Sequence, residues 1–201
     1  MMQRGALLTL AIGLVFSVSS SVFAQSATQT LAADLSSFGH EFQFYGPKNA
    51  PPNYMQWEWR AKAVGPCLLA VTMIKTQVGG DTPPDRIDHR YRATETTTFE
   101  VNVGALENAI PQHWNISYTN DLQRAASGVS VIFTEPFNLE TTTVRDIEYF
   151  GRDAGKEHKE DPIVRQSVHS FPQIRTTNER GPELLVASFE RAAKECAPPR
   201  R

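Results

Sequence analysis

The sequence predicts a β-rich α+β fold, an antiparallel barrel or bent sandwich of about seven strands closed by one C-terminal amphipathic helix. Three observations indicate this class. Most of the chain alternates apolar and polar residues with a period of two, which is typical of half-buried strands. Short runs of Gly, Pro, Asn and Asp separate these segments. The last apolar residues instead recur at a helical spacing.

The clearest alternation lies at 55–63, where Trp57 and Trp59 share one face and charged residues occupy the other. A run that is apolar on both faces follows at 67–74, as expected for a central strand. Residues 151–162 are interpreted as a charged, exposed loop. The other predicted strands lie at 87–93, 97–103, 114–118, 129–134, 141–150, 163–171 and 174–176.

The period changes near the C-terminus, where a helix is predicted over 182–196. Pro182 suits its first turn, and Leu185, Phe189 and Cys196 recur on one face. This order, strands followed by one helix, resembles the pleckstrin-homology-like architecture. No motif accompanies the likeness, so no function is carried over from it.

The first 24 residues are interpreted as a signal peptide that is removed after export. Arg4 precedes an apolar run at 6–16, and small residues lead to a cleavage site after Ala24. That run is too short to anchor the chain in a bilayer, and no other run approaches a spanning length. The expected location is therefore periplasmic or secreted, with no membrane span.

The rest of the chain is long enough for one domain with a sizeable core. Residues 25–53 are predicted to form a polar, loop-like N-terminal segment, with only a weak helix signal at 30–36. A single β-rich domain is expected at 54–197, ending in the helix at 182–196.

The only two cysteines, Cys67 and Cys196, are predicted to form a disulfide, because an exported chain with two cysteines has one internal pairing available. The alternative is two buried free thiols. Since Cys67 lies far from the cleavage site, no lipid anchor is expected. The formal net charge of −2 gives no basic surface of the kind that nucleic-acid binding requires, so no nucleic-acid partner is expected.

No motif for catalysis, a cofactor or a metal stands out. The five histidines lack the short spacings of metal sites, and neither a GxSxG elbow nor a phosphate-binding glycine loop occurs. The site analysis therefore assigns no catalytic, cofactor-binding or metal-ligating residue, and no cofactor is expected.

Two candidate binding sites remain. Trp57, Trp59, His89 and Tyr91 could line a ligand pocket, although alternation with charged residues also fits burial in the core. A second candidate, for an anion, is the row formed by Arg86, Arg90 and Arg92 on one strand face; the alternative is a solvated face.

The function expected from these features is an exported, soluble, non-enzymatic binding or accessory protein of the cell envelope, whose partner is an unknown small ligand or envelope protein. One alternative is a secreted surface-interaction protein. Another is a hydrolase with a His/carboxylate site around His89 and His169, using Asp88 or Glu100.

Overall fold

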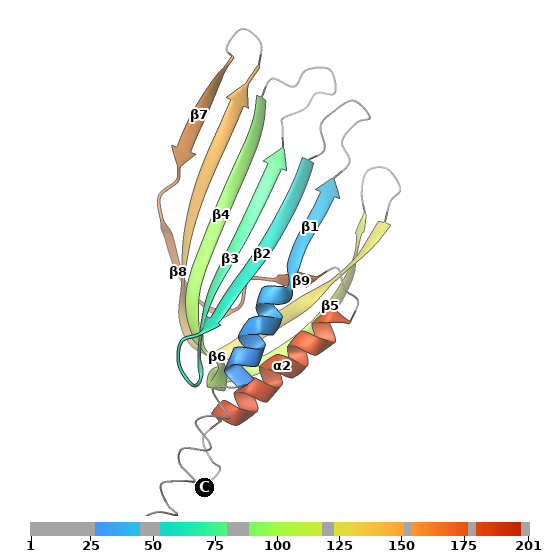
Figure 1. Ribbon diagram of the computed structural model, residues 1–201, viewed down its shortest axis with the longest axis vertical. Coiled ribbons are helices and arrows are strands. Elements are labelled where there is room, and N and C mark those ends of the chain that lie inside the picture. Colours follow the sequence, from blue (N-terminus) through green and yellow to red (C-terminus); the bar gives the residue numbers. More distant parts are fainter. Residues whose placement is uncertain are drawn as a thin grey trace, which may run out of the picture.

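Nine antiparallel strands form a curled half-barrel in the computed structural model, with two helices at its base among the described residues (Figure 1). The structure describes residues 27–44, 53–79, 89–117, 123–150, 154–176 and 180–197. The strands are β1 Gly39–Phe44, β2 Asn53–Ala63, β3 Leu68–Gly79, β4 His89–Asn102, β5 Leu106–Ser117, β6 Gln123–Tyr149, β7 Gly155–Glu160, β8 Val164–Ser170 and β9 Ile174–Thr176. The helices are the N-terminal helix, residues 27–37, and α2 Gly181–Cys196. The predicted β-rich α+β class with a C-terminal helix is confirmed.

Strand β6 belongs to both walls of the half-barrel. Its residues 140–149 pair with β4, and its residues 123–133 pair with β5, which follows β4 through the 3-10 turn η1 Val103–Ala105. The pairing of β6 with β8 shifts register between Ile132 and Phe137, where the long strand changes partners. The sequence analysis predicted two shorter strands here, because Pro136 interrupts the apolar pattern.

Strand β7 corrects the interpretation of residues 151–162 as a loop. All six of its side chains are exposed, so it lacks the apolar alternation by which a strand is recognised. It is held instead by backbone pairing with β6, from Val144↔Glu160 to Tyr149↔Gly155. Residues 151–153 lie outside the described residues.

The interpretation of residues 25–53 as loop-like is also corrected, because this segment contains the N-terminal helix and β1. Leu31 and Leu35, four residues apart, are fully buried in the core. Ser36 Oγ accepts a hydrogen bond from the Ala61 N–H at 2.8 Å, on the edge of β2 beyond the end of β1. The helix therefore covers a stretch of sheet edge as well as the core.

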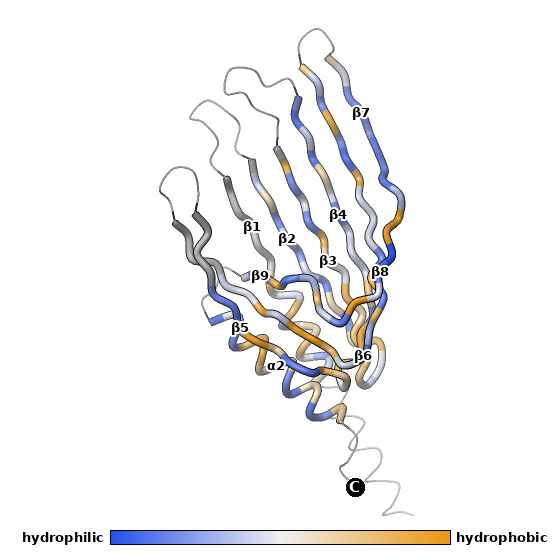
Figure 2. The backbone as a smooth tube through the Cα atoms, turned by 180° about the vertical axis from the view of Figure 1, so that it is seen from behind, coloured by the Kyte–Doolittle hydropathy of each residue, from blue (hydrophilic) through white to orange (hydrophobic). Residues whose placement is uncertain are grey.

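The core lies at the base, on the face of the sheet that carries Trp59. We call this the inner face and the opposite one the outer face. Phe171, directly after β8, is 6% exposed and sits among rings from β2, β4, β6 and α2. Its ring centroid lies 4.8–6.3 Å from those of Trp59, Phe99, Phe133, Phe137 and Phe189. Figure 2 shows hydrophobic residues gathered where β6 passes α2.

The predicted C-terminal helix is present as α2 and closes the base. Leu185, Phe189 and Ala192 are fully buried on one face of this helix. Pro182 occupies its first turn and no side chain caps its N-terminus.

Cys67 and Cys196 join the start of β3 to the end of α2. Their Cα atoms lie 5.6 Å apart and their sulfurs are bonded, as the predicted disulfide requires. The Val103 N–H donates a hydrogen bond to the Cys67 carbonyl at 2.9 Å. A Cβ atom at Gly104 would lie 3.2 Å from the Cys196 carbonyl oxygen, so η1 packs directly against this linkage.

The helices lie at the base, and the strands continue beyond them (Figure 1). We call this extension the upper sheet: residues 53–57 of β2, 75–79 of β3, 89–95 of β4, 143–149 of β6, and β7. Both of its faces carry half-buried and exposed side chains, whereas the inner face at the base is buried. None of the described helices is long and apolar enough to cross a membrane.

Replacing Phe171 tests whether the aromatic cluster holds the base together. We expect Phe171→Ala to lower the free energy of unfolding by about 3–5 kcal/mol, because it removes a buried ring from the centre of the core. Phe150→Ala is the matched control, since Phe150 is 42% exposed, and its effect should stay within about 0.5 kcal/mol. Urea unfolding measures both values, and equal losses would contradict the assignment.

Removing the disulfide should also destabilise the protein. The linkage spans 129 residues of sequence, and closing a loop of about this length contributes about 4–5 kcal/mol in the chain-entropy model. We expect Cys67→Ser/Cys196→Ser to lower the free energy of unfolding by up to that amount, as measured by urea denaturation. Thiol labelling of the unfolded, unreduced wild-type protein should find no free sulfhydryl; two labelled cysteines would refute the pairing.

Candidate functional site

Side chains of the upper sheet line up in rows across β2, β3, β4 and β6, because the pairing of these strands has no register shift. On the inner face, the row above the core is Trp57, Lys75, Glu95 and Thr143. The next row is Met55, Gln77, Ala93 and Arg145, followed by Gly79, Tyr91 and Ile147. The inner face thus changes from apolar to mixed as it leaves the base.

These upper rows border a hollow of about 400 Å³, which we call the inner hollow. It is lined by Lys75, Gln77, His89, Tyr91, Ala93, Glu95, Thr143, Arg145 and Ile147. Rings, aliphatic side chains and charged groups therefore border one space, which is the composition of a site for a small organic ligand.

Tyr91 is fixed in position within the inner hollow. Gln77 Nε2 donates a hydrogen bond to Tyr91 Oη at 2.8 Å. Across the strand pair, a Cβ atom at Gly79 would lie 2.9 Å from the same oxygen, so the phenol rests against the glycine. The absence of a side chain at Gly79 thus makes room for the Tyr91 ring.

The charged groups of the inner hollow are paired. Lys75 Nζ lies 3.7 Å from Glu95 Oε2, and Arg145 Nη2 lies 2.7 Å from Asp161 Oδ2. The Lys75–Glu95 pair is half-buried, and Arg145 of the second pair is exposed; both pairs keep the local charge balanced while presenting donors and acceptors.

The structure separates the four residues of the predicted ligand pocket into two groups. His89 and Tyr91 line the inner hollow. Trp57 and Trp59 share their face of the sheet but lie in the core, at 6% and 1% exposed. The Arg175 guanidinium lies 4.8 Å from the centre of the Trp57 ring and covers it. The tryptophans therefore form the floor beneath the hollow and do not line it.

The predicted arginine row lies on the outer face. Arg90 and Arg92 border a second space of about 610 Å³, which we call the outer hollow. Arg86 lies outside the described residues. In register, Arg92 faces Asp146 and Arg90 faces Glu148 on β6. The anion site remains a prediction, and two of its three arginines share a hollow.

The described residues of the hydrolase alternative, His89, Glu100 and His169, lie in different parts of the sheet. Glu100 is exposed and lies eleven positions from His89 along β4, which corresponds to about 36 Å of strand, with side chains on opposite faces. His169, on β8, has its Nδ1 3.1 Å from the Phe133 carbonyl oxygen of β6. Asp88 lies outside the described residues.

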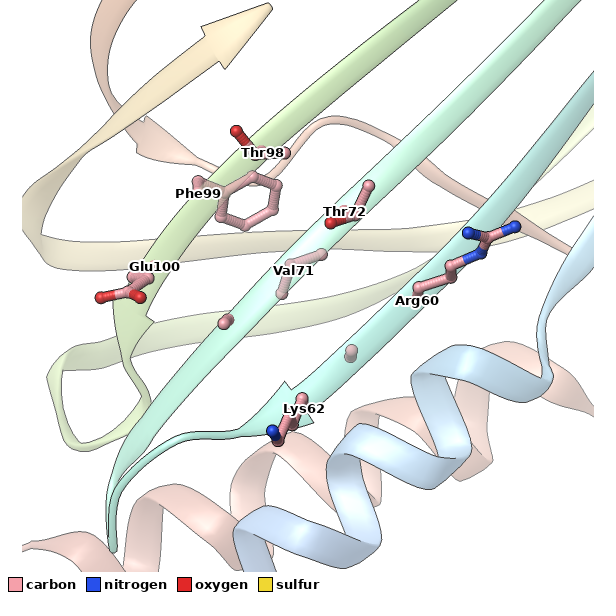
Figure 3. Close-up of a pocket in the computed structure, with 9 residues that line it drawn as sticks. Arg60, Lys62, Val71, Thr72, Thr98, Phe99 and Glu100 are labelled. Atoms are coloured by element: carbon pink, nitrogen blue, oxygen red, sulfur yellow. The ribbon is translucent and has the colours of Figure 1, made fainter.

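A third hollow, of about 390 Å³, lies on the lower outer face of β2, β3 and β4 (Figure 3). Arg60 and Glu100 border it from β2 and β4, with their charged ends pointing to opposite sides (Figure 3). Arg60 is already engaged by Glu58 at 2.6 Å on the same strand. Within the described residues, no group of three His, Cys, Asp or Glu side chains has the arrangement of a metal site.

Lys75, Glu95 and Arg145 are inner-hollow residues that sequence reasoning missed. Lys75 lies just after the strand predicted at 67–74, Glu95 lies between those predicted at 87–93 and 97–103, and Arg145 lies within the one predicted at 141–150. Only the cross-strand register brings them together, and a single sequence does not contain that register. Gly79 could have been noticed, since a glycine that ends an apolar run often permits a close approach.

His158 of β7 contacts two carboxylates, that of Asp146 on β6, which anchors β7 to β6, and that of Glu160 on β7 itself. Its Nδ1 lies 2.7 Å from Asp146 Oδ1, and its Nε2 lies 3.5 Å from Glu160 Oε1. The hydrogen bond with Asp146, and then that with Glu160, raises the pKa of His158 above its usual value. The protonated histidine thus favours the folded position of the strand.

The sign of this pKa shift predicts a pH dependence. A raised folded-state pKa gives a stabilisation that is complete below the unfolded pKa of about 6.5. This stabilisation is lost as the pH rises through the raised folded pKa of His158. We expect Asp146→Asn to lower the His158 pKa in an NMR titration, whereas Glu135→Gln, at an exposed residue outside this cluster, leaves it unchanged. An unaltered titration in Asp146→Asn would contradict the pairing.

Known proteins were compared with the chain at the levels of family, sequence and structure. No family model, curated protein or solved structure matches it. The observations that bear on its function are the two hollows of the upper sheet and the side chains that border them.

Proposed function

We propose that this chain is an exported, soluble, non-enzymatic binding protein of the cell envelope, and that its ligand occupies the inner hollow. The observation that carries the proposal is the open inner face of the upper sheet. A sheet normally buries its apolar face against a second layer. Here Met55, Tyr91 and Ile147 are only half-buried, beyond the end of the core.

The fixed geometry of the inner hollow supports binding. Tyr91 is held by Gln77 and rests against Gly79, while Lys75 and Glu95 hold each other. A site whose side chains are already ordered loses little conformational entropy when a ligand enters. In the lowest of the upper-sheet rows Trp57 is buried, which gives the surface a rigid border at its lower end.

The surroundings of His113, His158 and His169 fit a role without catalysis. His113 pairs with Glu183 and His158 with Asp146, both on exposed surfaces. His169 lies against a backbone carbonyl. None of these contacts links a histidine to both a carboxylate and a hydroxyl, the arrangement that activates a nucleophile.

Export is supported by the cysteine pair. Cys67 and Cys196 are the two cysteines of the chain and are placed for a disulfide, a bond that forms in oxidising compartments. The predicted signal peptide, residues 1–24, lies outside the described residues.

The test begins with protein exported from cells that express the full chain, whose N-terminal sequencing should start at Gln25. Thermal-shift screening against fatty acids, sugars and organic acids should then find a ligand that raises the unfolding midpoint. We expect Tyr91→Ala to weaken the binding of that ligand about tenfold or more, because it removes the ring that borders the hollow. Tyr54→Ala, on the outer face, is the matched control and should change affinity less than twofold.

Two results would refute the proposal. One is a panel in which no compound shifts the unfolding midpoint of the correctly exported protein. The other is a ligand whose affinity is unaffected by Tyr91→Ala. Retention of the full chain inside the cell would refute the exported location separately.

A further inference from the structure

The outer hollow combines two unpaired arginines with an apolar surface. Arg90 and Arg92 alternate with Tyr91 along β4, so their side chains share the outer face. Neither guanidinium makes an ion pair or hydrogen bond with any described residue. Arg90 is half-buried and Arg92 exposed, so both are open to a ligand.

The acids nearest to these arginines are engaged elsewhere. Asp146, which faces Arg92 in register, lies 2.7 Å from His158 on β7. Glu148, which faces Arg90, has its Oε1 3.5 Å from Lys156 Nζ, which is also on β7. Strand β7 therefore supplies the cations that hold these two carboxylates, and the arginine donors remain available.

The other side of Arg92 is apolar. Its neighbour in register on β3 is Val78, and the neighbour of Val78 on β2 is Tyr54. Both side chains are half-buried and border the outer hollow. A ligand in this space would meet a ring and an aliphatic side chain on one flank. On the other it would meet two guanidinium groups, with Asp146, Glu148 and Glu157 beyond them, each carboxylate already engaged by another side chain.

We infer that the outer hollow is a second binding site, distinct from the inner hollow, for an organic anion with an apolar or aromatic body. Each guanidinium offers a fork of donors that matches the oxygens of a carboxylate, sulfonate or phosphate group. Tyr54 and Val78 would cover the apolar body. The two arginines lie two positions apart on one strand, roughly 7 Å, so both can reach the same acidic head group.

The probe pair is 8-anilinonaphthalene-1-sulfonate and its uncharged relative N-phenyl-1-naphthylamine, which carries the same rings without the sulfonate. Fluorescence titration of the folded protein measures both affinities. We expect Arg90→Gln/Arg92→Gln to weaken the affinity for the sulfonate probe at least tenfold, because the donors for its oxygens are removed. The affinity for the uncharged probe should change less than twofold.

Two further double variants remove the same number of positive charges from other places. Arg60→Gln/Lys62→Gln, at the lower outer face, should leave sulfonate affinity within twofold of wild type. Lys75→Gln/Arg145→Gln tests the inner hollow and should likewise have little effect. Val78→Thr, which keeps the shape of the side chain but replaces a methyl group by a hydroxyl, should weaken the binding of both probes.

The inference is overturned if folded wild-type protein binds no sulfonate saturably, or if Arg90→Gln/Arg92→Gln binds it as wild type does. Loss of binding only in Lys75→Gln/Arg145→Gln would place the anion in the inner hollow, which refutes this site while leaving the proposed function intact. Circular dichroism and urea midpoints confirm that each variant is folded. Arg92→Gln alone, at an exposed position, provides a milder test if the double variant unfolds.

Discussion

The contacts around Phe171 hold together parts of the chain that are far apart in sequence. Its ring meets those of Trp59 on β2, Phe99 on β4, Phe133 on β6 and Phe189 on α2. The strands among them, β2, β4 and β6, belong to one hydrogen-bonded sheet, whereas α2 lies outside that sheet and is placed against it by side-chain packing. The curvature of the sheet, and with it the orientation of everything above the base, depends on this cluster.

From this base the upper sheet extends as a single layer with two different faces. Because side chains alternate along each strand, residues directed inward continue the core, while their neighbours are directed outward. On β4 this alternation sends Tyr91 to the inner hollow and Arg90 and Arg92 to the outer one. The two candidate sites are thus consequences of one strand register. Tyr91 and Ile147 border both hollows, whereas Lys75 and Glu95 border only the inner one and Arg90 and Arg92 only the outer one.

Much of the fold could be predicted from local patterns, and most of the site could not. Alternation around Trp57 and the helical spacing of Leu185 and Phe189 correspond to β2 and α2 as observed. The N-terminal helix was predicted only as a weak signal at 30–36, because Leu31 and Leu35 stand in a polar segment, and β7 was missed because its stability comes from pairing and charge. Lys75 and Arg145 meet only through cross-strand register, which is a property of the whole sheet.

Strand β7 determines where the sheet ends. It pairs with β6 on one side, and its six residues, GKEHKE, are all exposed, with charged side chains on both faces beside the other edge. An incoming strand from a neighbouring molecule would have to strip water from these charges to form its ladder, a cost that natural edge strands use to prevent polymerisation. The open half-barrel can therefore keep a long exposed border and still resist growth into fibres.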